Sequence, residues 1–448
     1  MISTQARTAL VTRTTCRICD SPELAPVLDL GEQCISGAFA DPGGDQPVQR
    51  AIPLQLVRCD MTRDQRACGL VQTRHTVPGK ILYRSYWYRS GINRTMTENL
   101  HDIARSAERL VDLQPGDLVL DIGCNDGTLL DGYTTQDLRY LGFDPSDVTR
   151  YAIEKGYDVA CDFFSNEAFR QRCGDGRAKV VSSIAMLYDL EDPAAFFADV
   201  TKTLAHAGVW VMELHYLPTM LEMNSFDAIV HEHLEYYSFA VLERLLLSVG
   251  LEAINVELND INGGSIRIFA AHRQTLEITP EAERTMQDLR VREFELALDS
   301  PAPYEAFARR AKKIRDELRT LCLKLRDEGK TIHVYGASTK GNTILQYANL
   351  DSSIIPFAAD RNPDKHGSET IRTRIPIISE EESRAMNPDY YLVLPWHFLD
   401  EFIERERDYL KGGGSLIVPL PNVRVLDGAT LDYNSVDIAE LTSPTHDE

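Results

Sequence analysis

Four cysteines near the start of the chain have a spacing that could hold a metal ion. Cys16 and Cys19 form a C-x-x-C pair, and Cys59 and Cys68 follow with eight residues between them. Two thiolate pairs held by tight turns are a common way to build a tetrahedral zinc site. The wide second spacing leaves a redox pair or unconnected thiols as alternatives, and Cys34 could replace one ligand. We expect structural zinc, because a catalytic zinc usually has histidine ligands and an open position.

A glycine-containing turn follows an apolar run at residues 119–130, VLDIGCNDGTLL. The run predicts a strand that ends at Asp121, followed by a turn with Gly123 and Gly127 and then a helix. The backbone N–H groups of such a turn can approach a ligand. Asp144 ends the next apolar run, 23 residues after Asp121. A carboxylate at that position can accept hydrogen bonds from both hydroxyls of a ribose.

The charge of this turn indicates its ligand. Asn125 stands between the two glycines, so the dinucleotide fingerprint G-x-G-x-x-G is not met. Asp121 and Asp126 would repel a pyrophosphate but attract the sulfonium and amino groups of S-adenosylmethionine. The turn therefore favours S-adenosylmethionine over a dinucleotide, and a purely structural turn between strand and helix is the remaining alternative.

A third motif, HEHLEYYS at 231–238, combines acid–base and aromatic residues. Its two histidines do not have the H-E-x-x-H spacing of a zinc helix, and no third ligand is near. A histidine is a good general base at neutral pH, and a neighbouring Glu232 could fix its tautomer. Tyr236 and Tyr237 could close the pocket and donate to an oxyanion. The alternative is that all these residues only cap and pack.

The elements that position these motifs fall into several regions. Residues 80–255 alternate short apolar runs with amphipathic segments, which predicts a parallel, doubly wound α/β sheet. A long helix is expected within 280–328, ended by Gly329, and a second α/β unit at 330–425. The first 75 residues show little helical periodicity. A region so short needs an additional stabilising element, such as a bound zinc ion.

Composition excludes several classes of protein. The 448 residues suggest two to four domains. The formal net charge of −21 argues against binding to nucleic acid or to an anionic membrane surface. No apolar run approaches the ~20 residues of a membrane helix, and the N-terminus lacks the apolar core of a signal peptide. We therefore expect a cytoplasmic protein whose nine cysteines are thiols or metal ligands.

Taken together, the motifs resemble the nucleotide-sugar C-methyltransferases of deoxysugar pathways, including those of antibiotic biosynthesis. The resemblance follows the family's order over nearly the whole chain, and its stretches are CRICDSPELAPVLDLGEQ, CGLVQ, YWYRSG, LDIGCNDGTLL, HEHLEYYS, NGGSIRIF, YGASTKGNT and DRNPDKHG. It implies a zinc-binding domain at 1–78 and a class I methyltransferase domain at 79–258. A helical linker and a Rossmann-like α/β domain at 259–448 would complete the sugar nucleotide site.

The resemblance also implies a reaction. A base removes the proton next to the ketone of a nucleoside-diphosphate 4-keto-6-deoxy sugar, and the enolate carbon attacks the sulfonium methyl. The expected catalytic residues are His233 as base with support from Glu232, His231, Tyr86, Tyr88 and Tyr188. The expected S-adenosylmethionine contacts are Asp121, Gly123, Asn125, Asp126, Gly127, Asp144, Pro145, Asp162, Phe163 and Met186.

The nucleotide and its phosphates would contact the C-terminal motifs, and the residues expected there are Ser265, Arg267, Lys340, Asn342 and Tyr237. Lys340 would be the positive partner of the diphosphate, and Arg267 and Arg361 would add to a local basic pocket.

Three departures from the family pattern concern the acceptor. Val230 stands where a tyrosine commonly precedes H-E-H, Tyr188 stands where a histidine is common, and YGASTKGN replaces a motif closer to YGATAKS. An O-methyltransferase acting on a sugar or another polyhydroxy acceptor therefore stays open, as does an NAD-dependent oxidoreductase. We expect a monomer or a weak homo-oligomer.

Overall fold

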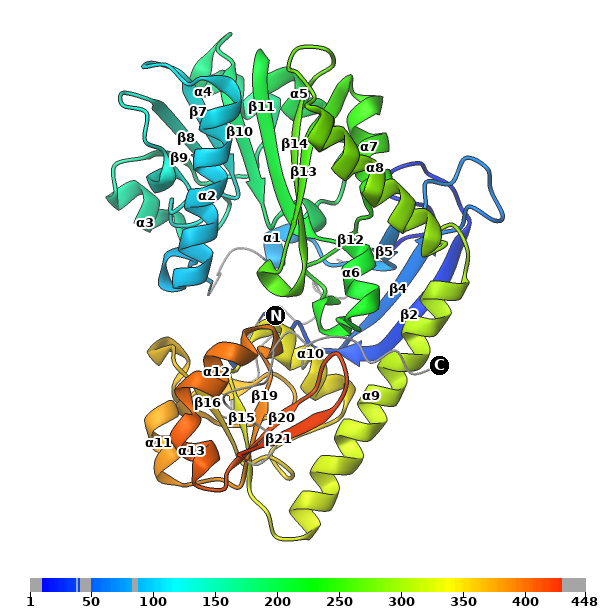
Figure 1. Ribbon diagram of the computed structural model, residues 1–448, viewed down its shortest axis with the longest axis vertical. Helices are drawn as coiled ribbons and strands as arrows, with labels where there is room; N and C mark the ends of the chain where they lie inside the picture. The colour runs from blue at the N-terminus through cyan, green and yellow to red at the C-terminus, as the bar shows by residue number, and fades with distance from the viewer. Residues whose placement is uncertain (1–9, 38, 41–49, 83–87, 429–448) are drawn as a thin grey trace, which may run out of the picture.

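The computed structural model describes residues 10–37, 39–40, 50–82 and 88–428 of the chain. Its N-terminal part is built around a four-stranded antiparallel sheet in the order β12-β5-β4-β2. Strands β2, β4 and β5 lie within the first 75 residues, whereas β12 comes from the H-E-H region far downstream (Figure 1). The elements of this part are β1 (Val11–Thr12), β2 (Leu24–Gln33), β3 (Phe39–Ala40), β4 (Ile52–Cys59), β5 (Val71–Thr73), β6 (His75–Thr76), α1 (Gly79–Leu82) and β12 (Glu235–Tyr236).

The middle part contains a seven-stranded sheet in the order β13-β14-β11-β10-β7-β8-β9. Strand β14 runs antiparallel to both of its neighbours, and the other pairs are parallel. This order is that of class I methyltransferases and confirms the predicted fold class. The strands are β7 (Leu118–Ile122), β8 (Arg139–Phe143), β9 (Asp158–Ala160), β10 (Ala178–Ile184), β11 (Leu204–His215), β13 (Leu251–Asn259) and β14 (Ser265–His272).

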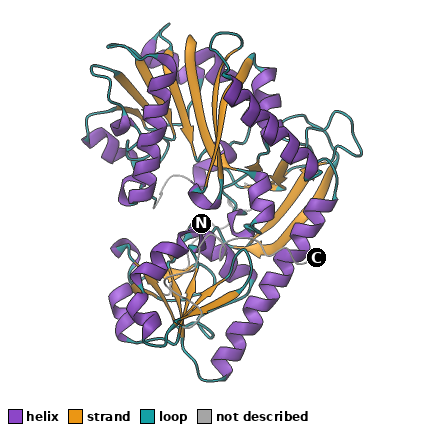
Figure 2. Cartoon of the chain, in the orientation of Figure 1, coloured by secondary structure: helices purple, strands orange, loops and turns teal. Residues whose placement is uncertain are grey.

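Helices cover both faces of this sheet (Figure 2). Successive side chains of a strand point to opposite faces. Val119 and Val211 accordingly join the core under α2, whereas Leu120 and Met212 join the core under α5, α7 and α8. The helices of this part are α2 (Arg94–Val111), α3 (Thr149–Glu154), α4 (Asn166–Cys173), α5 (Pro193–Thr203), α6 (Leu217–Glu222), α7 (Phe239–Ser248) and α8 (Pro280–Glu295).

The predicted long helix is α9 (Ala302–Asp327), which leads into the C-terminal part and is followed by Gly329 with a φ of +76°. There a six-stranded sheet has the order β18-β16-β15-β19-β20-β21, parallel except for β21. The elements of the C-terminal part are β15 (Ile332–Tyr335), α10 (Thr339–Tyr347), β16 (Phe357–Asp360), β17 (Glu369–Thr370), β18 (Ile377–Ser379), α11 (Glu380–Ala385), β19 (Tyr390–Val393), α12 (Leu399–Arg405), α13 (Arg407–Lys411), β20 (Ser415–Val418) and β21 (Arg424–Asp427). Strand β17 pairs with β3 and is not part of the six-stranded sheet.

The two α/β sheets meet at the edges where ligands usually bind. In open α/β sheets the ligand lies outside the carboxyl ends of the strands, where the strand order reverses direction. These points lie between β7 and β10 in the middle part and between β15 and β19 in the C-terminal part. Lys340, just after β15, donates to Asn262 at the carboxyl end of β13, and Trp396, after β19, donates to Asp227. The two edges are therefore in contact, with α6 and α10 near the junction (Figure 1).

Candidate functional site

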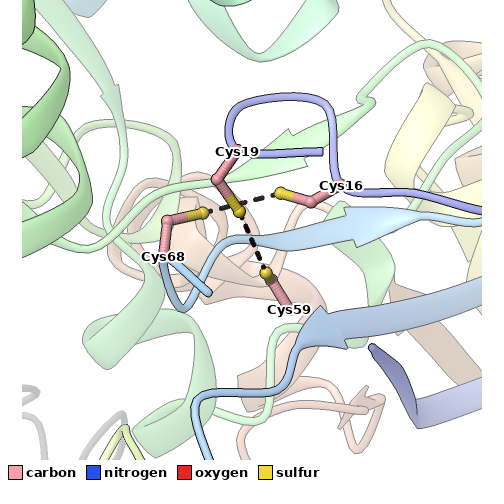
Figure 3. A group of neighbouring side chains, drawn as sticks. All are labelled: Cys16, Cys19, Cys59 and Cys68. Atoms are coloured by element: carbon pink, nitrogen blue, oxygen red, sulfur yellow. Dashed lines mark hydrogen bonds between the residues drawn. The ribbon is translucent and has the colours of Figure 1, made fainter. Parts of the chain in front are cut away.

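The four predicted cysteines converge in the N-terminal part (Figure 3). Sγ of Cys16 lies 3.5 Å from that of Cys68, and Sγ of Cys19 lies 3.5 Å from that of Cys59. All four sulfur atoms lie within 4.8 Å of one another. A tetrahedral zinc with Zn–S bonds of about 2.3 Å needs sulfur atoms about 3.8 Å apart. The cluster therefore fits zinc, as predicted.

Local structure explains why these four sulfur atoms meet. The C-x-x-C turn is closed by Ile18, whose N–H donates to Sγ of Cys16 at 3.5 Å. Cys59 is the last residue of β4, and Cys68 is followed by Gly69 with a φ of +82°. Cys34 is not part of the cluster, since it is buried against Ile371 and its N–H donates to Gln346.

We expect the protein to bind one zinc ion per chain. Metal binding contributes folding free energy where the core is small, so Cys59→Ser should lose the metal and make the N-terminal part sensitive to limited proteolysis. Elemental analysis of the purified variants measures the metal. Cys34→Ser is the matched control, because this cysteine is equally buried but lies outside the cluster, and it should keep its zinc.

The glycine turn lies at the reversal point between β7 and β10. The N–H groups of Gly123 and Cys124 donate to the carbonyl of Phe143 at 2.7 and 3.2 Å, which anchors the turn to β8. Gly123 and Gly127 have φ angles of +79° and +76°. A Cβ on Gly123 would lie 3.1 Å from Cγ of Met186 after β10. The backbone of the turn is therefore closely covered by Met186.

Two buried acids border this turn. Asp121 is 3 % exposed and accepts a 2.6 Å hydrogen bond from Oγ of Ser182. Burial raises the pKa of Asp121 to about 7. Asp144 accepts from the N–H and Oγ of Ser146 through one oxygen and from the N–H of Asn125 through the other. A cation bound here would favour the ionised form of Asp121.

The side chains of Asn125 and Asp126 hold a neighbouring segment. Asn125 accepts from the N–H of Ser90 at 3.1 Å and donates to the carbonyl of Tyr88 at 3.0 Å. Asp126 accepts from the N–H of Gly91 at 3.0 Å. These two residues therefore hold residues 88–91, the Tyr88 segment, against the turn. Tyr86, the other tyrosine of this motif, lies outside the described residues.

The remaining predicted donor contacts lie on loops at the same edge of the sheet. Pro145 follows β8 directly after Asp144 and is partly buried. Asp162 and Phe163 follow β9 and are exposed, and Asp162 accepts from the N–H of Phe163 at 2.8 Å. Their side chains are accessible to a ligand lying over the carboxyl ends of β7, β8 and β9.

His233 is the partly exposed histidine of the H-E-H segment. Its Nδ1 lies 2.9 Å from the carbonyl of Ala228, so Nδ1 carries the proton and Nε2 keeps its lone pair. The ring centroid lies 4.3 Å from that of Tyr188 and 5.9 Å from that of His215. Burial, with a further contribution from Lys340, lowers the pKa of His233 to about 3. The imidazole is therefore neutral at physiological pH.

The other residues of this segment have different partners. His231 is 1 % exposed, and its Nε2 donates to the carbonyl of Ile52 at 3.2 Å. Glu232 accepts from the N–H of Gly37 at 3.0 Å. The hydroxyl groups of Tyr236 and Tyr237 donate to backbone carbonyls rather than pointing to a shared oxyanion position, and both rings are buried.

Lys340 lies at the junction, in the first turn of α10. Its Nζ donates to the carbonyl of Asn262 at 2.6 Å. Burial lowers the pKa of Lys340 to about 8, and the nearby carboxylate of Asp227 opposes this shift. Asp227 is 1 % exposed and accepts a 2.9 Å hydrogen bond from Nε1 of Trp396. The charge of Lys340 contributes to the lowered pKa values of His215, His233 and His397, so Lys340 lies near these three histidines.

The structure places the other predicted substrate residues away from a basic pocket. Arg267, on β14, is paired with Glu213 at 2.8 Å, Asp102 at 2.9 Å and Glu257 at 3.1 Å, and these carboxylates already satisfy its charge. Ser265 donates to the carbonyl of Ile261, Asn342 donates to the carbonyl of Ser36, and Arg361 is exposed beside Glu380. The expected basic cluster with Arg267 is not formed.

Models of three protein families match successive parts of the chain. They are described as "Putative zinc binding domain" at residues 16–83, "Methyltransferase domain" at 88–256 and "C-methyltransferase C-terminal domain" at 260–421. C-methyltransferase NovU of Streptomyces niveus is 29 % identical over 413 residues, which is 92 % of this chain and 96 % of that protein. The chain belongs to a family of C-methyltransferases with an N-terminal zinc-binding domain. This membership decides for methyl transfer and against the oxidoreductase alternative.

Solved structures overlap with the C-methyltransferase over a smaller share. A chain of the complex between the Haloferax volcanii Trm112 methyltransferase activator and a methyltransferase is 15 % identical, with a TM-score of 0.34 over 41 % of this chain and 95 % of that chain. Magnesium protoporphyrin IX methyltransferase from Synechocystis PCC 6803 is 14 % identical, with a TM-score of 0.29 over 40 % of this chain and 81 % of that chain. Similarities this weak do not indicate an activity. Within the described residues, no helix combines the length and apolar character needed to cross a bilayer.

Three residues of this junction were missed by sequence reasoning. His215 is the last residue of β11, His397 follows β19, and Asp227 lies in the loop after α6. The pKa of His215 is far below its usual range because of burial and the nearby charge of Lys340. The signal that could have found the two histidines is a polar residue at the carboxyl end of a buried strand, where α/β sheets bind ligands.

Proposed function

We propose that this C-methyltransferase moves the methyl group of S-adenosylmethionine to the carbon next to the ketone of a nucleoside-diphosphate 4-keto-6-deoxy sugar. The main support for this proposal is the orientation of His233. Its Nδ1 donates to the carbonyl of Ala228, so the Nε2 lone pair can accept a proton. The likeness of the C-terminal motifs to those of nucleotide-sugar enzymes supports the acceptor class. We place the reaction in a deoxysugar pathway and the protein in the cytoplasm.

The proposed donor site is the carboxyl edge of the middle sheet. Asp121 would balance the positive charge of S-adenosylmethionine, and Asp144 would accept from its ribose hydroxyls. Asp162 would face the adenine amino group, with Pro145, Phe163 and Met186 packing on the adenosine. Gly123 and Gly127 would let the backbone approach the bound S-adenosylmethionine. Asn125 and Asp126 would position the Tyr88 segment.

We expect the affinity for S-adenosylmethionine to rise with pH through about 7. Asp121 has a pKa of about 7 in the free protein, and the bound cation favours its ionised form. Below this pH the carboxyl of Asp121 must lose its proton before it can balance the cation, and this weakens binding. The affinity should therefore increase about tenfold between pH 6 and 8. Calorimetry measures this slope. In Asp121→Asn the affinity should be lower and independent of pH, and an unchanged slope would remove Asp121 from the site.

The proposed acceptor site is the junction of the two sheets. His233 Nε2 takes the proton from the carbon next to the ketone, and the C–H electron pair forms the enolate. The enolate carbon then attacks the methyl carbon in line, and the methyl–sulfur bond breaks to release S-adenosylhomocysteine. Tyr188, Tyr88 and Glu232 would shape this pocket. The sequence suggests the same role for Tyr86.

Lys340 would stabilise negative charge on the acceptor. The sequence suggests the diphosphate as its partner, but its place beside three histidines favours the enolate oxygen. An ammonium fixed near a developing oxyanion stabilises the transition state strongly in a water-poor site. Ser265 and Asn342 would support the loops around the nucleotide, and Tyr237 would pack behind them. Arg267 and its three carboxylates are left out of the proposal.

The three parts would act as a zinc-binding domain at 1–78, a methyltransferase domain at 79–258 and a linker with the Rossmann-like domain at 259–448. One chain contains every element of the proposed site, so we propose a monomer or a weak homo-oligomer.

Deuterium exchange tests the proposed reaction. In D2O, dTDP-4-keto-6-deoxyglucose incubated with the protein and S-adenosylhomocysteine should take up deuterium at one carbon next to the ketone faster than without protein. The reaction of an O-methyltransferase does not require removal of this proton. Exchange no faster than in the absence of protein would contradict C-methylation of this acceptor class.

A further inference from the structure

The H-E-H segment is held mainly by the N-terminal part of the molecule. His231 donates to the carbonyl of Ile52, the first residue of β4, and Glu232 accepts from the N–H of Gly37. A Cβ on Gly37 would lie 2.6 Å from Oε1 of Glu232, so the backbone approaches this carboxylate closely. Both residues that precede His233 are therefore fixed by the part that carries the cysteines.

The residues after His233 are fixed by the same part. The N–H of Thr73 donates to the carbonyl of Leu234 at 2.9 Å. Glu235 then pairs with Gln72, and the short strand β12 extends the sheet of β5, β4 and β2. The segment therefore has a backbone register set by β5. The His233 ring, in contrast, contacts Ala228 and Tyr188 of the middle part.

A buried ion pair joins this segment to the cysteine cluster. Nε of Arg17 lies 3.4 Å from Oε1 of Glu235, and both side chains are 0 % exposed. Arg17 also donates to the carbonyl of Thr73 at 2.7 Å and to Oγ1 of Thr76 at 2.6 Å. Arg17 directly follows Cys16 in the sequence. Within the described ranges, Arg17 is the only cation within salt-bridge distance of Glu235.

The anchors of the catalytic segment thus sit next to the cluster in the chain. Arg17 adjoins one cysteine, β4 ends at Cys59, and β5 begins three residues after Cys68. A metal ion bound by the four sulfur atoms would fix these three anchors relative to one another. Without it, a small part with a limited core has less to hold them in place.

We propose that Arg17 and Glu235 are positioning residues through which the metal-bound cysteine cluster fixes the place of the His233 ring. The inference rests on the proposed function only in treating His233 as the base. It predicts that the N-terminal part contributes to the rate of methyl transfer and not only to folding. A misplacement of about 1 Å at a catalytic group can cost about 100-fold in rate.

The test uses the double variant Arg17→Met/Glu235→Met. Removing one partner alone would leave an unpaired buried charge and risk unfolding, whereas apolar side chains of similar volume are often tolerated. We expect a folded protein with one zinc per chain and unchanged affinity for S-adenosylhomocysteine. With dTDP-4-keto-6-deoxyglucose, kcat should fall about 10- to 100-fold with little change in KM. The His233 ring resonances, assigned with His233→Gln, should shift.

Arg58 and Asp60 provide a matched control. This pair is joined at 2.9 Å, both side chains are 4 % exposed, and it flanks Cys59 as Arg17 flanks Cys16. Within the described ranges, no side-chain hydrogen bond or ion pair joins either residue to the H-E-H segment. Arg58→Met/Asp60→Asn should therefore lower thermal stability but leave kcat and the His233 resonances unchanged.

The inference is overturned if Arg17→Met/Glu235→Met keeps the wild-type His233 resonances, or if both double variants lower kcat equally. Chelating the zinc from the wild-type protein should produce the same shift of the His233 resonances as the Arg17→Met/Glu235→Met variant. The resonances and the S-adenosylhomocysteine affinity need no acceptor. If wild-type protein fails to turn over the sugar, the proposed function fails, but these readouts still decide the role of Arg17 and Glu235.

Discussion

Replacing His233 by glutamine is expected to lower methyl transfer by about 10²- to 10⁴-fold, because general-base catalysis contributes an effect of this size. A glutamine side chain can still donate to the carbonyl of Ala228, which now accepts from Nδ1 of His233. It has no basic lone pair to take the proton. Binding of S-adenosylmethionine, measured by calorimetry, should stay unchanged, because the residues proposed to bind it lie on the loops after β7, β8, β9 and β10.

His231 provides the matched control from the same motif. It is buried and donates to the carbonyl of Ile52, which a glutamine amide could also do. His231→Gln should therefore keep the rate within a few-fold of wild type. Turnover retained in His233→Gln would remove His233 as the base, and a large loss in both variants would indicate that the motif acts only through its structure.

Replacing Lys340 by methionine is expected to lower kcat by about 10²- to 10³-fold, the usual effect of removing a charge that stabilises an oxyanion. Lys340 has a pKa of about 8, so its ammonium form is present below this pH and is lost as pH rises through it. The wild-type rate should therefore fall above pH 8. The falling limb should be absent from Lys340→Met.

The acid side of this profile differs from what the sequence predicts. An ordinary histidine would give a rising limb near pH 6.5. His233 has a pKa of about 3, so its neutral form persists far below that pH and no limb from this group is expected between pH 5 and 8. A rising limb near 6.5 that disappears in His233→Gln would contradict the lowered pKa of His233.

Binding of dTDP separates the two roles of Lys340. If the ammonium acts on the enolate, Lys340→Met should bind dTDP as tightly as wild type does. A large loss of dTDP affinity would assign Lys340 to the diphosphate instead. Lys330→Met is the control, because this lysine is exposed and paired with Asp389, so both kcat and dTDP affinity should be unchanged.

Much of the fold follows from local patterns in the sequence. The cysteine spacing identifies all four members of the cluster, because tight turns need only neighbouring residues to form. The alternation of apolar runs predicts both α/β sheets, and Gly329 marks the end of α9. The turn at Gly123 is recognisable because positive φ angles favour glycine.

The acceptor side could not be predicted in the same way. Lys340 lies near His215, His233 and His397 only because two sheets dock edge to edge, and no spacing in the sequence records that proximity. Arg267 stands in a motif that suggests phosphate binding, but the β11–β14 register places it opposite Glu213. A cross-strand partner is not visible from one strand alone.

The H-E-H motif illustrates a finer limit. In a straight strand, His231 and His233 would share one face. The segment bends at residues 231–232, and the two rings meet different parts of the molecule. The residue types of the motif suggest a general base. Only the backbone path distinguishes His233, whose Nδ1 donates to Ala228, from the buried His231.

The position of the new methyl group distinguishes transfer to carbon from transfer to oxygen. The protein is incubated with dTDP-4-keto-6-deoxyglucose and S-adenosylmethionine carrying a 13C methyl group, and the product is examined by 13C NMR. Transfer to carbon predicts a methyl signal coupled to a ring carbon next to the ketone. A methyl signal bonded to oxygen, or no labelled product from this acceptor, would contradict it.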